Sequence, residues 1–318
     1  MSQNIVLGIK PYTPSTPFRL ALPTEQALID AGKALFNNLD SWKSVKVYKR
    51  KSGNQSYSVN TFVRPKLPTD EVSWFMRHSV HQPEHGSFDD FWNFLGKNKA
   101  VNEQEFIPEI KSVNLLKTVS PMQSIWTLYY TFSPPVTPRT FTVLQTVHIT
   151  GGEHGSPREG WIISVPVDVS EDTEMKAKEA KGTRGRYASV ELVKEGQDGT
   201  LEWRMATAST PGGLIPKVFV EKSMPSQIEK DVGHFLHWLQ GKKGAKSSMT
   251  NAVPAPREST GTNGETMMDN ADQETPAMTM DNEATMDASS SEPPMTSTDV
   301  PISSDAPPAT ATTEATQM

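Results

Sequence analysis

Alternation of apolar and polar residues dominates the middle of the chain, between residues 126 and 205. Five segments carry apolar side chains at every second position, which is the period of a β-strand with one buried face. These segments are residues 126–132, 141–149, 161–167, 188–192 and 201–205. Mostly short polar turns separate them, so we expect consecutive strands to pair in an antiparallel sheet.

Three further strands are expected nearer the amino terminus. Residues 45–47 and 57–63 alternate in the same way on either side of the turn Ser52-Gly53-Asn54, which predicts a hairpin. Residues 111–119 bring the predicted sheet to about eight strands. Residues 71–77, in contrast, are predicted to form a short helix.

Helical periodicity flanks this strand-rich region. Thr24 is placed to cap one helix, and Ser87 with Asp90 forms a capping box that starts another. A further short helix is expected at residues 102–109. The first helix has apolar residues at helical spacing: Leu28, Ala31, Leu35 and Leu39.

The closing helix, residues 214–240, is the longest predicted helix, and Pro225 predicts a kink in it. Its apolar residues recur every three or four positions and so share one face. They are Ile228, Val232, Phe235, Leu236 and Leu239. The pattern therefore predicts an α+β fold in which a long final helix packs on an antiparallel sheet.

Three strings resemble motifs of a known family. The string YYTFSPPVTPRTF at residues 129–141 resembles a segment of START domains in which a strand ends at an aromatic-proline turn. The string TPGGLIPK at residues 210–217 resembles the START motif DPGGxIPK, which leads into the closing helix, although Thr210 stands where lipid-transfer members have Asp. The string DVGHFLHW at residues 231–238 is similar to one in a fungal START-like family of unknown function, domain of unknown function 3074.

This resemblance to the StAR-related lipid-transfer (START-like) superfamily covers residues 24–240. It implies a helix-grip fold, a curved antiparallel sheet around a long, kinked C-terminal helix with an apolar cavity between them. Physical chemistry supports the corner at residues 210–217 independently. Pro211 cannot continue a strand ladder, and Gly212 and Gly213 can adopt positive φ for a sharp reversal.

Composition divides the chain into three parts. Residues 1–23 form an extended proline-containing lead, residues 24–240 the START-like domain, and residues 241–318 an acidic tail rich in Ser, Thr, Pro and Met. From residue 251 onward there is one basic residue against twelve acidic ones and no Phe, Trp or Tyr, so we expect disorder. The remaining body has 30 basic and 25 acidic residues.

Several classes of site and location are disfavoured by what the sequence lacks. The 318 residues contain no cysteine, which excludes disulfides and thiolate chemistry and is typical of a reducing compartment. The first ten residues do not resemble a secretory signal, and no segment is long and apolar enough to span a membrane. We therefore expect a cytoplasmic protein, without a cofactor or a bound metal.

The candidate ligand-binding residues follow from alternation and from the predicted helix face. Gln145 is polar but shares a strand face with Phe141 and Val143, so it needs a polar partner inside the protein or on a ligand. Thr61 and Thr207 raise the same question. The full set expected to line the cavity is Gln145, Phe141, Val143, Trp126, Trp161, Ile163, Met205, Trp203, Val232 and Phe235.

Two clusters are compatible with binding but have simpler explanations. His78, His81 and His85 are spaced closely enough to suggest zinc, yet Pro83 and Gly86 favour a solvated loop. The basic residues of the first hairpin, residues 43–51, are interleaved with Trp42 and Tyr48 and could contact an anionic membrane. A plain exposed hairpin is the more ordinary explanation, and nothing matches a nucleic-acid-binding module.

The resemblance favours a non-enzymatic carrier or sensor of a hydrophobic small molecule such as a lipid or sterol, with transient membrane-surface contact. One alternative is an interaction adaptor that works through the acidic tail. A cyclase or hydrolase on the same scaffold is the other, but it needs an acid and a base in the cavity, and the inward positions show Gln and Thr instead. The oligomeric state is left open.

Overall fold

The computed structural model describes residues 5–13, 22–134, 136–213, 215 and 217–250. Of the predicted disordered tail, residues 241–250 belong to the last helix, and residues 251–318 lie outside the described part of the chain. The helices are α1 (Glu25–Asn37), α2 (Phe88–Leu95), α3 (Lys99–Phe106), α4 (Thr173–Lys178) and α5 (Lys217–Thr250), with short 3₁₀ turns η1 (Leu39–Ser41) and η2 (Glu153–Gly155).

The strands form one ten-stranded sheet. They are β1 (Lys43–Ser52), β2 (Gln55–Arg64), β3 (Trp74–His81), β4 (Ile110–Ser120), β5 (Gln123–Tyr130), β6 (Arg139–Thr150), β7 (Glu159–Pro166), β8 (Thr183–Arg184), β9 (Arg186–Glu195) and β10 (Leu201–Thr210). Their order is β1-β2-β3-β10-β9-β7-β6-β5-β4, antiparallel throughout, and β8 pairs in parallel with β6. The edges of the sheet are therefore β1 and β4.

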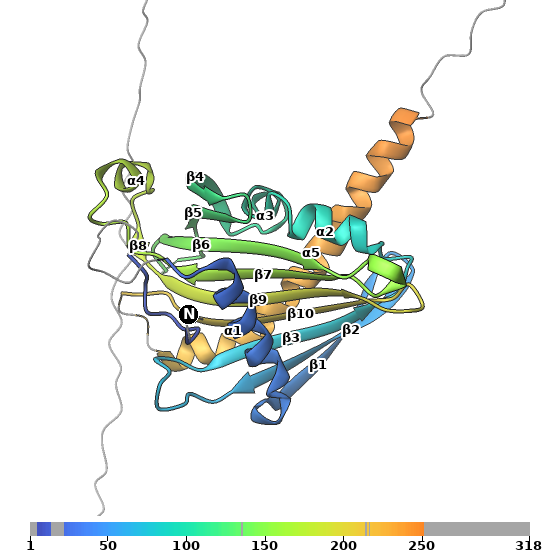
Figure 1. Cartoon of the computed structure of the whole chain (residues 1–318), viewed down its shortest axis with the longest axis horizontal. Coiled ribbons are helices and arrows are strands. Elements are labelled where there is room, and N and C mark those ends of the chain that lie inside the picture. Colours follow the sequence, from blue (N-terminus) through green and yellow to red (C-terminus); the bar gives the residue numbers. More distant parts are fainter. Residues whose placement is uncertain (1–4, 14–21, 135, 214, 216, 251–318) are drawn as a thin grey trace, which may run out of the picture. The chain divides into compact units, whose positions relative to one another are not determined.

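Two faces of the sheet carry separate cores. Helix α1 packs on β6 and β7, while α5 contacts β1, β2 and β3 and α2 contacts β9. Figure 1 shows α1 in front of the sheet and α5 behind it. We call the face under α1 the outer face and the face under α5 the inner face.

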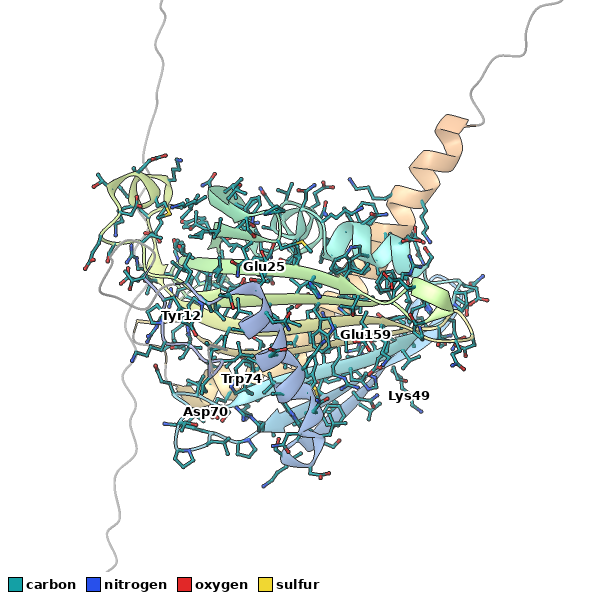
Figure 2. All side chains as sticks on the ribbon, viewed as in Figure 1. Tyr12, Glu25, Lys49, Asp70, Trp74 and Glu159 are labelled. Carbon is teal, nitrogen blue, oxygen red and sulfur yellow. The ribbon has the colours of Figure 1, made fainter. Side chains whose placement is uncertain are left out.

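The outer face is covered by α1 and by residues 5–13. Leu28, Ile29 and Phe36 of α1 are buried against the strands. Gly32 lets the helix approach closely, because a Cβ there would lie 2.9 Å from Cδ1 of Ile163. Trp74 belongs to the same cluster and lies beside α1 (Figure 2).

Most of the predicted elements are confirmed. Thr24 caps α1 through a hydrogen bond from the Ala27 amide, and Ser87 with Asp90 forms the predicted capping box. The corner before α5 has Gly212 and Gly213 at φ of +65° and +67°. A side chain at Gly212 would meet the carbonyl oxygen of Arg184 at 2.2 Å, so only glycine fits.

Three predictions about local structure were wrong. Residues 74–81 form strand β3 instead of the short helix expected at 71–77. The apolar run Trp74-Phe75-Met76 looked non-alternating because β3 is buried on both faces. Helix α3 starts earlier than expected, and Leu39 lies beyond the end of α1, where it is 50% exposed.

Helix α5 runs without a break through Pro225 and continues ten residues past Gln240. Among the described residues, no helix is both long and apolar enough to cross a membrane.

Candidate ligand-binding site

The strand register decides which predicted site residues share a face. Gln145 of β6 pairs with Ser164 of β7, which pairs with Ser189 of β9. Val147 pairs with Ile162, and both belong to the core under α5. Gln145 and Ser164 therefore point to the inner face, and the alternate residues of β7 point to the outer one.

Eight of the ten predicted cavity residues lie on the inner face or on the buried side of α5: Gln145, Phe141, Val143, Trp126, Met205, Trp203, Val232 and Phe235. Trp161 and Ile163 do not. They pack under α1, where the ring of Trp161 lies 5.9 Å from that of Phe36. Strand β7 is buried on both faces, so apolar alternation alone assigned these two residues to the wrong side.

At the centre of the inner face, aromatic rings fill the space beneath α5. The ring of Phe235 lies 5.2 Å from that of Trp203 and 5.0 Å from that of Phe91, with tilted or edge-to-face geometry. All three side chains are at most 1% exposed. Phe91, Trp203 and Phe235 thus form a closed aromatic block, and together with the buried Val232 they hold α5 on the sheet.

A looser group lies on β5, β6 and β9. Trp126, Tyr130 and Tyr187 are only partly buried around Val143, and Phe141 contacts both tyrosine rings, at 5.3 and 5.6 Å. Burial raises the pKa of Tyr130 and of Tyr187, so both phenols are neutral at physiological pH. These residues offer apolar walls with hydroxyl groups among them.

Gln145 is 7% exposed, and no hydrogen bond joins its side chain to another described residue. Thr61 and Thr207 differ, since their hydroxyls donate to the carbonyl oxygens of Lys46 and Ala188 at 2.9 and 3.1 Å. The two threonines are therefore satisfied within the sheet. Gln145 is not, which is uncommon for a buried amide.

A charged cluster lies between the sheet and the helices of the inner face. Nη2 of Arg77 is 3.1 Å from Oε1 of Glu191, and Nζ of Lys99 is 2.8 Å from Oε2 of the same carboxylate. Lys99 also pairs with Glu103 of its own helix at 2.6 Å. The indole Nε1 of Trp203 donates to Glu191 at 2.7 Å.

The guanidinium of Arg77 has hydrogen-bond donors that lack a partner among the described residues. Its guanidinium carbon lies 3.9 Å from the centre of the Trp203 ring, and the residue is 2% exposed. Its Nε and Nη1 have no hydrogen-bond partner among the described residues. A buried guanidinium with unpartnered N–H groups is costly, and it is well suited to bind a phosphate, a carboxylate or a hydroxyl.

Burial governs the titration of this cluster. Burial raises the pKa of Asp231 on α5 to about 7, although Arg77 opposes the change. Burial alone would also raise the pKa of Glu191, but Lys99 and Arg77 outweigh it and lower that pKa. Burial lowers the pKa of Arg77 itself, against the pull of Glu191. Glu191 is thus the ionised anchor, and Asp231 titrates near neutral pH.

The inner face therefore also carries charges, which the expectation of an apolar cavity did not include. This cluster was missed because the sequence pattern predicted a helix at residues 71–77. Without a predicted strand there, the alternation that points Arg77 toward the inner face could not be recognised. The alternation in β9 assigned Ala188 and Val190 to the core and left Glu191 on the supposedly solvated face. The usable signal was the neighbouring β7, whose uninterrupted apolar run WIISVPV at residues 161–167 is typical of a strand buried on both sides.

The histidine cluster is also placed differently from the prediction. His81 and His85 are buried beside Tyr57, with their own rings 5.4 Å apart, and do not form a solvated loop. Burial, together with the nearby charges of His85 and Arg77, lowers the pKa of His81 to about 3. Among the described residues, no group of three or more His, Asp or Glu side chains is arranged to hold a metal ion.

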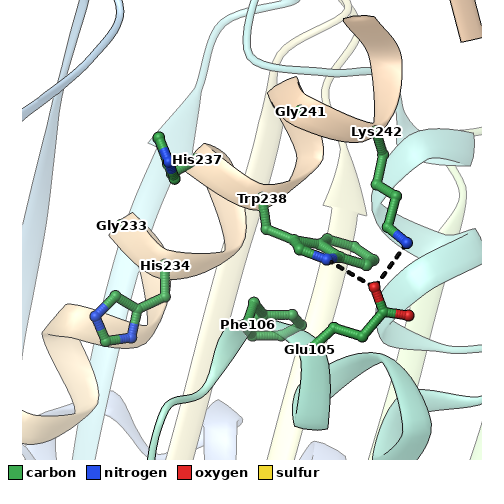
Figure 3. Close-up of a pocket in the computed structure, with 8 residues that line it drawn as sticks. All are labelled: Glu105, Phe106, Gly233, His234, His237, Trp238, Gly241 and Lys242. Carbon is green, nitrogen blue, oxygen red and sulfur yellow. Dashed lines mark hydrogen bonds and ion pairs between the residues drawn. The ribbon is translucent and has the colours of Figure 1, made fainter. Parts of the chain in front are cut away.

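A separate groove of about 460 Å³ lies between α3 and α5 (Figure 3). Glu105 bridges its rim, accepting hydrogen bonds from Nε1 of Trp238 at 3.2 Å and from Nζ of Lys242 at 2.6 Å. His234 and His237 line it together with Phe106, Gly233 and Gly241. The two histidines thus lie beside the buried stripe of α5.

Comparisons with known proteins agree with this architecture. A family model described as "Protein of unknown function (DUF3074)" matches residues 74–239, just over half of the chain. Human STARD10 superposes with a TM-score of 0.56 at 10% identity, covering 75% of this chain and 88% of that one. Human StAR-related lipid transfer protein 5 gives 0.54 at 10% identity, covering 69% and 96%. No curated protein sequence matches the chain.

Proposed function

Since the chain belongs to the DUF3074 family and has the helix-grip fold of StAR-related lipid-transfer domains, we propose that it binds a hydrophobic ligand on its inner face, as a carrier or sensor rather than as an enzyme. The ligand is an amphiphile: a lipid or sterol-like molecule with an apolar body and a polar head. The similar human structure is named for lipid transfer, which supports the class of ligand by analogy.

The observation that carries this proposal is the buried Arg77, with two nitrogens, Nε and Nη1, whose N–H groups have no acceptor among the described residues. A protein built only for stability gains nothing from such groups, because an unmade buried hydrogen bond costs about 1–3 kcal/mol. A polar ligand head that accepts these hydrogen bonds would remove that cost. Gln145, whose amide also lacks a partner, is the second group that would orient the head.

The apolar body of the ligand would lie against the looser group formed by Trp126, Phe141, Val143, Tyr130 and Tyr187. Each square ångström of apolar ligand surface removed from water contributes roughly 25 cal/mol. The closed aromatic block of Phe91, Trp203 and Phe235 serves a different role here. It fixes α5 over the sheet and so defines one wall of the site.

Catalysis on the same scaffold has less support. Among the described residues, Ser79 and His81 are a close hydroxyl–imidazole pair, with Oγ 2.8 Å from Nε2. Both residues are at most 1% exposed beneath Tyr57, Phe91 and Trp203. The pair therefore lacks the access to substrate that a nucleophile and its base need.

The test is ligand capture by the full chain. The purified protein is incubated with mixed-lipid vesicles, separated from them and analysed by native mass spectrometry with lipid extraction. We expect a stoichiometric amphiphile in the wild-type protein and a changed or reduced lipid profile in Arg77→Met. Repeated recovery of folded, ligand-free wild-type protein would contradict the proposal.

A further inference from the structure

The β1–β2 hairpin has an unusual charge distribution. Residues 43–64 contain six basic residues and no acidic one. The whole chain, in contrast, has a net charge of −6. Any attraction of this protein to an anionic surface must therefore come from a local patch rather than from its overall charge.

Strand β1 presents this charge at a free edge. It pairs only with β2, and eight of its ten residues are exposed. Helix α1 packs on β6 and β7, far from this edge in the strand order, and leaves the outer face of β1 open. Figure 2 shows Lys49 at the border of the sheet, pointing away from it.

Three of the lysines are not used by the fold. Arg50 pairs with Glu229 at 2.6 Å, Arg64 pairs with Asp70 at 2.9 Å, and the ammonium of Lys46 lies over the Tyr48 ring. Within the described part of the chain, no ion pair involves the remaining three, Lys43, Lys49 and Lys51.

Apolar residues are exposed among these lysines. Val47, Lys49 and Lys51 pair with Asn60, Ser58 and Ser56 and so form one row on the outer face. Val47 is 50% exposed. The strand register is interrupted at Val45, a β-bulge that leaves this residue 46% exposed as well.

We propose that the exposed edge strand β1, with Val45 and Val47 beside Lys49 and Lys51 on the outer face and Lys43 at the start of the strand, is a docking surface for an anionic lipid bilayer. Ammonium groups are attracted to the lipid phosphates and carboxylates, while the valines enter the interface between headgroups and acyl chains. This inference rests on the proposed function for its purpose, because a carrier or sensor of lipid must meet a membrane. The observations that support it, exposed lysines and valines on β1, do not depend on whether the inner face binds a ligand.

Lysines on an edge strand also have a simpler role, since they prevent edge-to-edge aggregation. The opposite edge β4 separates the two explanations. It too carries exposed lysines, Lys111 and Lys117, beside the exposed Leu115 and Val119. However, β4 has two lysines, whereas β1 has five basic residues and its hairpin contains no acidic residue, so the positive charge is denser at β1. It therefore supplies a matched control.

The experiment measures co-sedimentation of the full chain with phosphatidylserine–phosphatidylcholine vesicles and with pure phosphatidylcholine vesicles. We expect binding to the former, weakened by salt. Lys49→Gln with Lys51→Gln should lower the partition coefficient about 30-fold, at a factor of roughly five per lysine. Lys111→Gln with Lys117→Gln should change it less than about twofold, and Val47→Ser should lower it about fivefold with an unchanged salt dependence.

Three outcomes would overturn the inference: no preference for anionic vesicles, equal losses in the two double variants, or tighter binding to a single-stranded oligonucleotide that is lost in the β1 variant. Ligand capture, measured on the same proteins, keeps the two proposals apart. The β1 variant should still carry ligand once loaded. If wild-type protein docks through β1 but never captures a ligand, the inference stands and the proposed function fails.

Discussion

The two faces of the sheet use buried polar residues in different ways. On the outer face several buried polar side chains are hydrogen-bonded: Gln123 donates to the Pro23 carbonyl and to Thr146, and the Thr142 hydroxyl lies within hydrogen-bond distance of Thr127 and Glu179. On the inner face Nε and Nη1 of the buried Arg77 have no hydrogen-bond partner among the described residues, and no hydrogen bond joins the Gln145 side chain to a described residue. Because the same strands form both faces, the difference in buried polar groups comes from the choice of side chains and not from the backbone fold.

The comparison indicates what each face contributes. Burying charges costs free energy that their mutual attraction barely recovers, and well-packed apolar residues of similar volume are often at least as stable. Beneath α1 the outer face follows this solution with a buried apolar cluster that includes Leu28, Phe36 and Trp161. The inner face instead buries a charged cluster, and a ligand could form hydrogen bonds with the unpartnered groups of that cluster.

The largest expected effect is on the outer face. Trp161→Ala removes a buried indole that packs beside Phe36 and should lower the free energy of unfolding by about 3–5 kcal/mol. Urea unfolding measures this loss. Ligand carried per folded molecule should not change, and a selective loss of ligand at full stability would place Trp161 in the site after all.

A smaller loss is expected on the inner face. Arg77→Met fills a similar volume but removes one cation from Glu191, which keeps Lys99 and Trp203 as partners. The expected destabilisation is about 1.5–3 kcal/mol, the range for a hydrogen bond to a charged group. Captured ligand should fall much more than stability does.

Lys33→Met is the control for Arg77→Met, because Lys33 of α1 lies over the outer-face Trp161 ring as Arg77 lies over Trp203. It should leave ligand capture unchanged. If both variants lost ligand in proportion to their stability, the two faces would not differ in function.

The sequence predicted the strands and helix caps better than it predicted which residues face the inner side of the sheet. Alternation in β5, β6 and β10 was predicted correctly, as were the caps at Thr24 and Ser87, because each depends on residues close in the chain. Burial on both faces of β3 and β7 depends on α1 and α5, which are distant in sequence. For this reason Arg77 and Glu191 were missed, and Trp161 and Ile163 were assigned to the wrong face.

Asp231 provides a pH test of the inner face. Its pKa in the folded protein is about 7, above the ordinary value of 3.8, so between these values the folded state holds a proton that the unfolded state releases. Stability contributed by this group is therefore lost as pH rises from about 4 to 7. Asp231→Asn lacks this loss and should be more stable than wild type at pH 8 by roughly 1–2 kcal/mol, a figure reduced for the surface that the carboxyl retains.

Thermal unfolding at pH 5 and pH 8 measures the difference. The gain of Asp231→Asn over wild type should be several degrees larger at pH 8 than at pH 5. A gain that is the same at both pH values would mean that Asp231 is ionised in the folded state throughout, and that the inner face is wetter than its burial indicates.

Two glutamines on adjacent strands give the sharpest contrast between the faces, and one of them, Gln145, gives the smallest expected effect on stability. Gln145 of β6 and Gln123 of β5 are 7% and 6% exposed, but only Gln123 donates hydrogen bonds from its side chain, at 3.0 and 3.1 Å. Gln123→Leu should cost about 1–3 kcal/mol because it leaves buried acceptors unpaired. Gln145→Leu should change stability by less than about 0.5 kcal/mol in ligand-free protein, since it breaks no bond within the described chain.

The ligand assay should show the reverse order. Gln145→Leu should alter which lipids are captured, because one group that orients the polar head is gone, while Gln123→Leu should capture the wild-type profile. Urea unfolding and lipid extraction on the same two variants give four measurements. If Gln145→Leu is as destabilising as Gln123→Leu and captures the same lipids, then the Gln145 amide is satisfied by water, and Arg77 alone recognises the head.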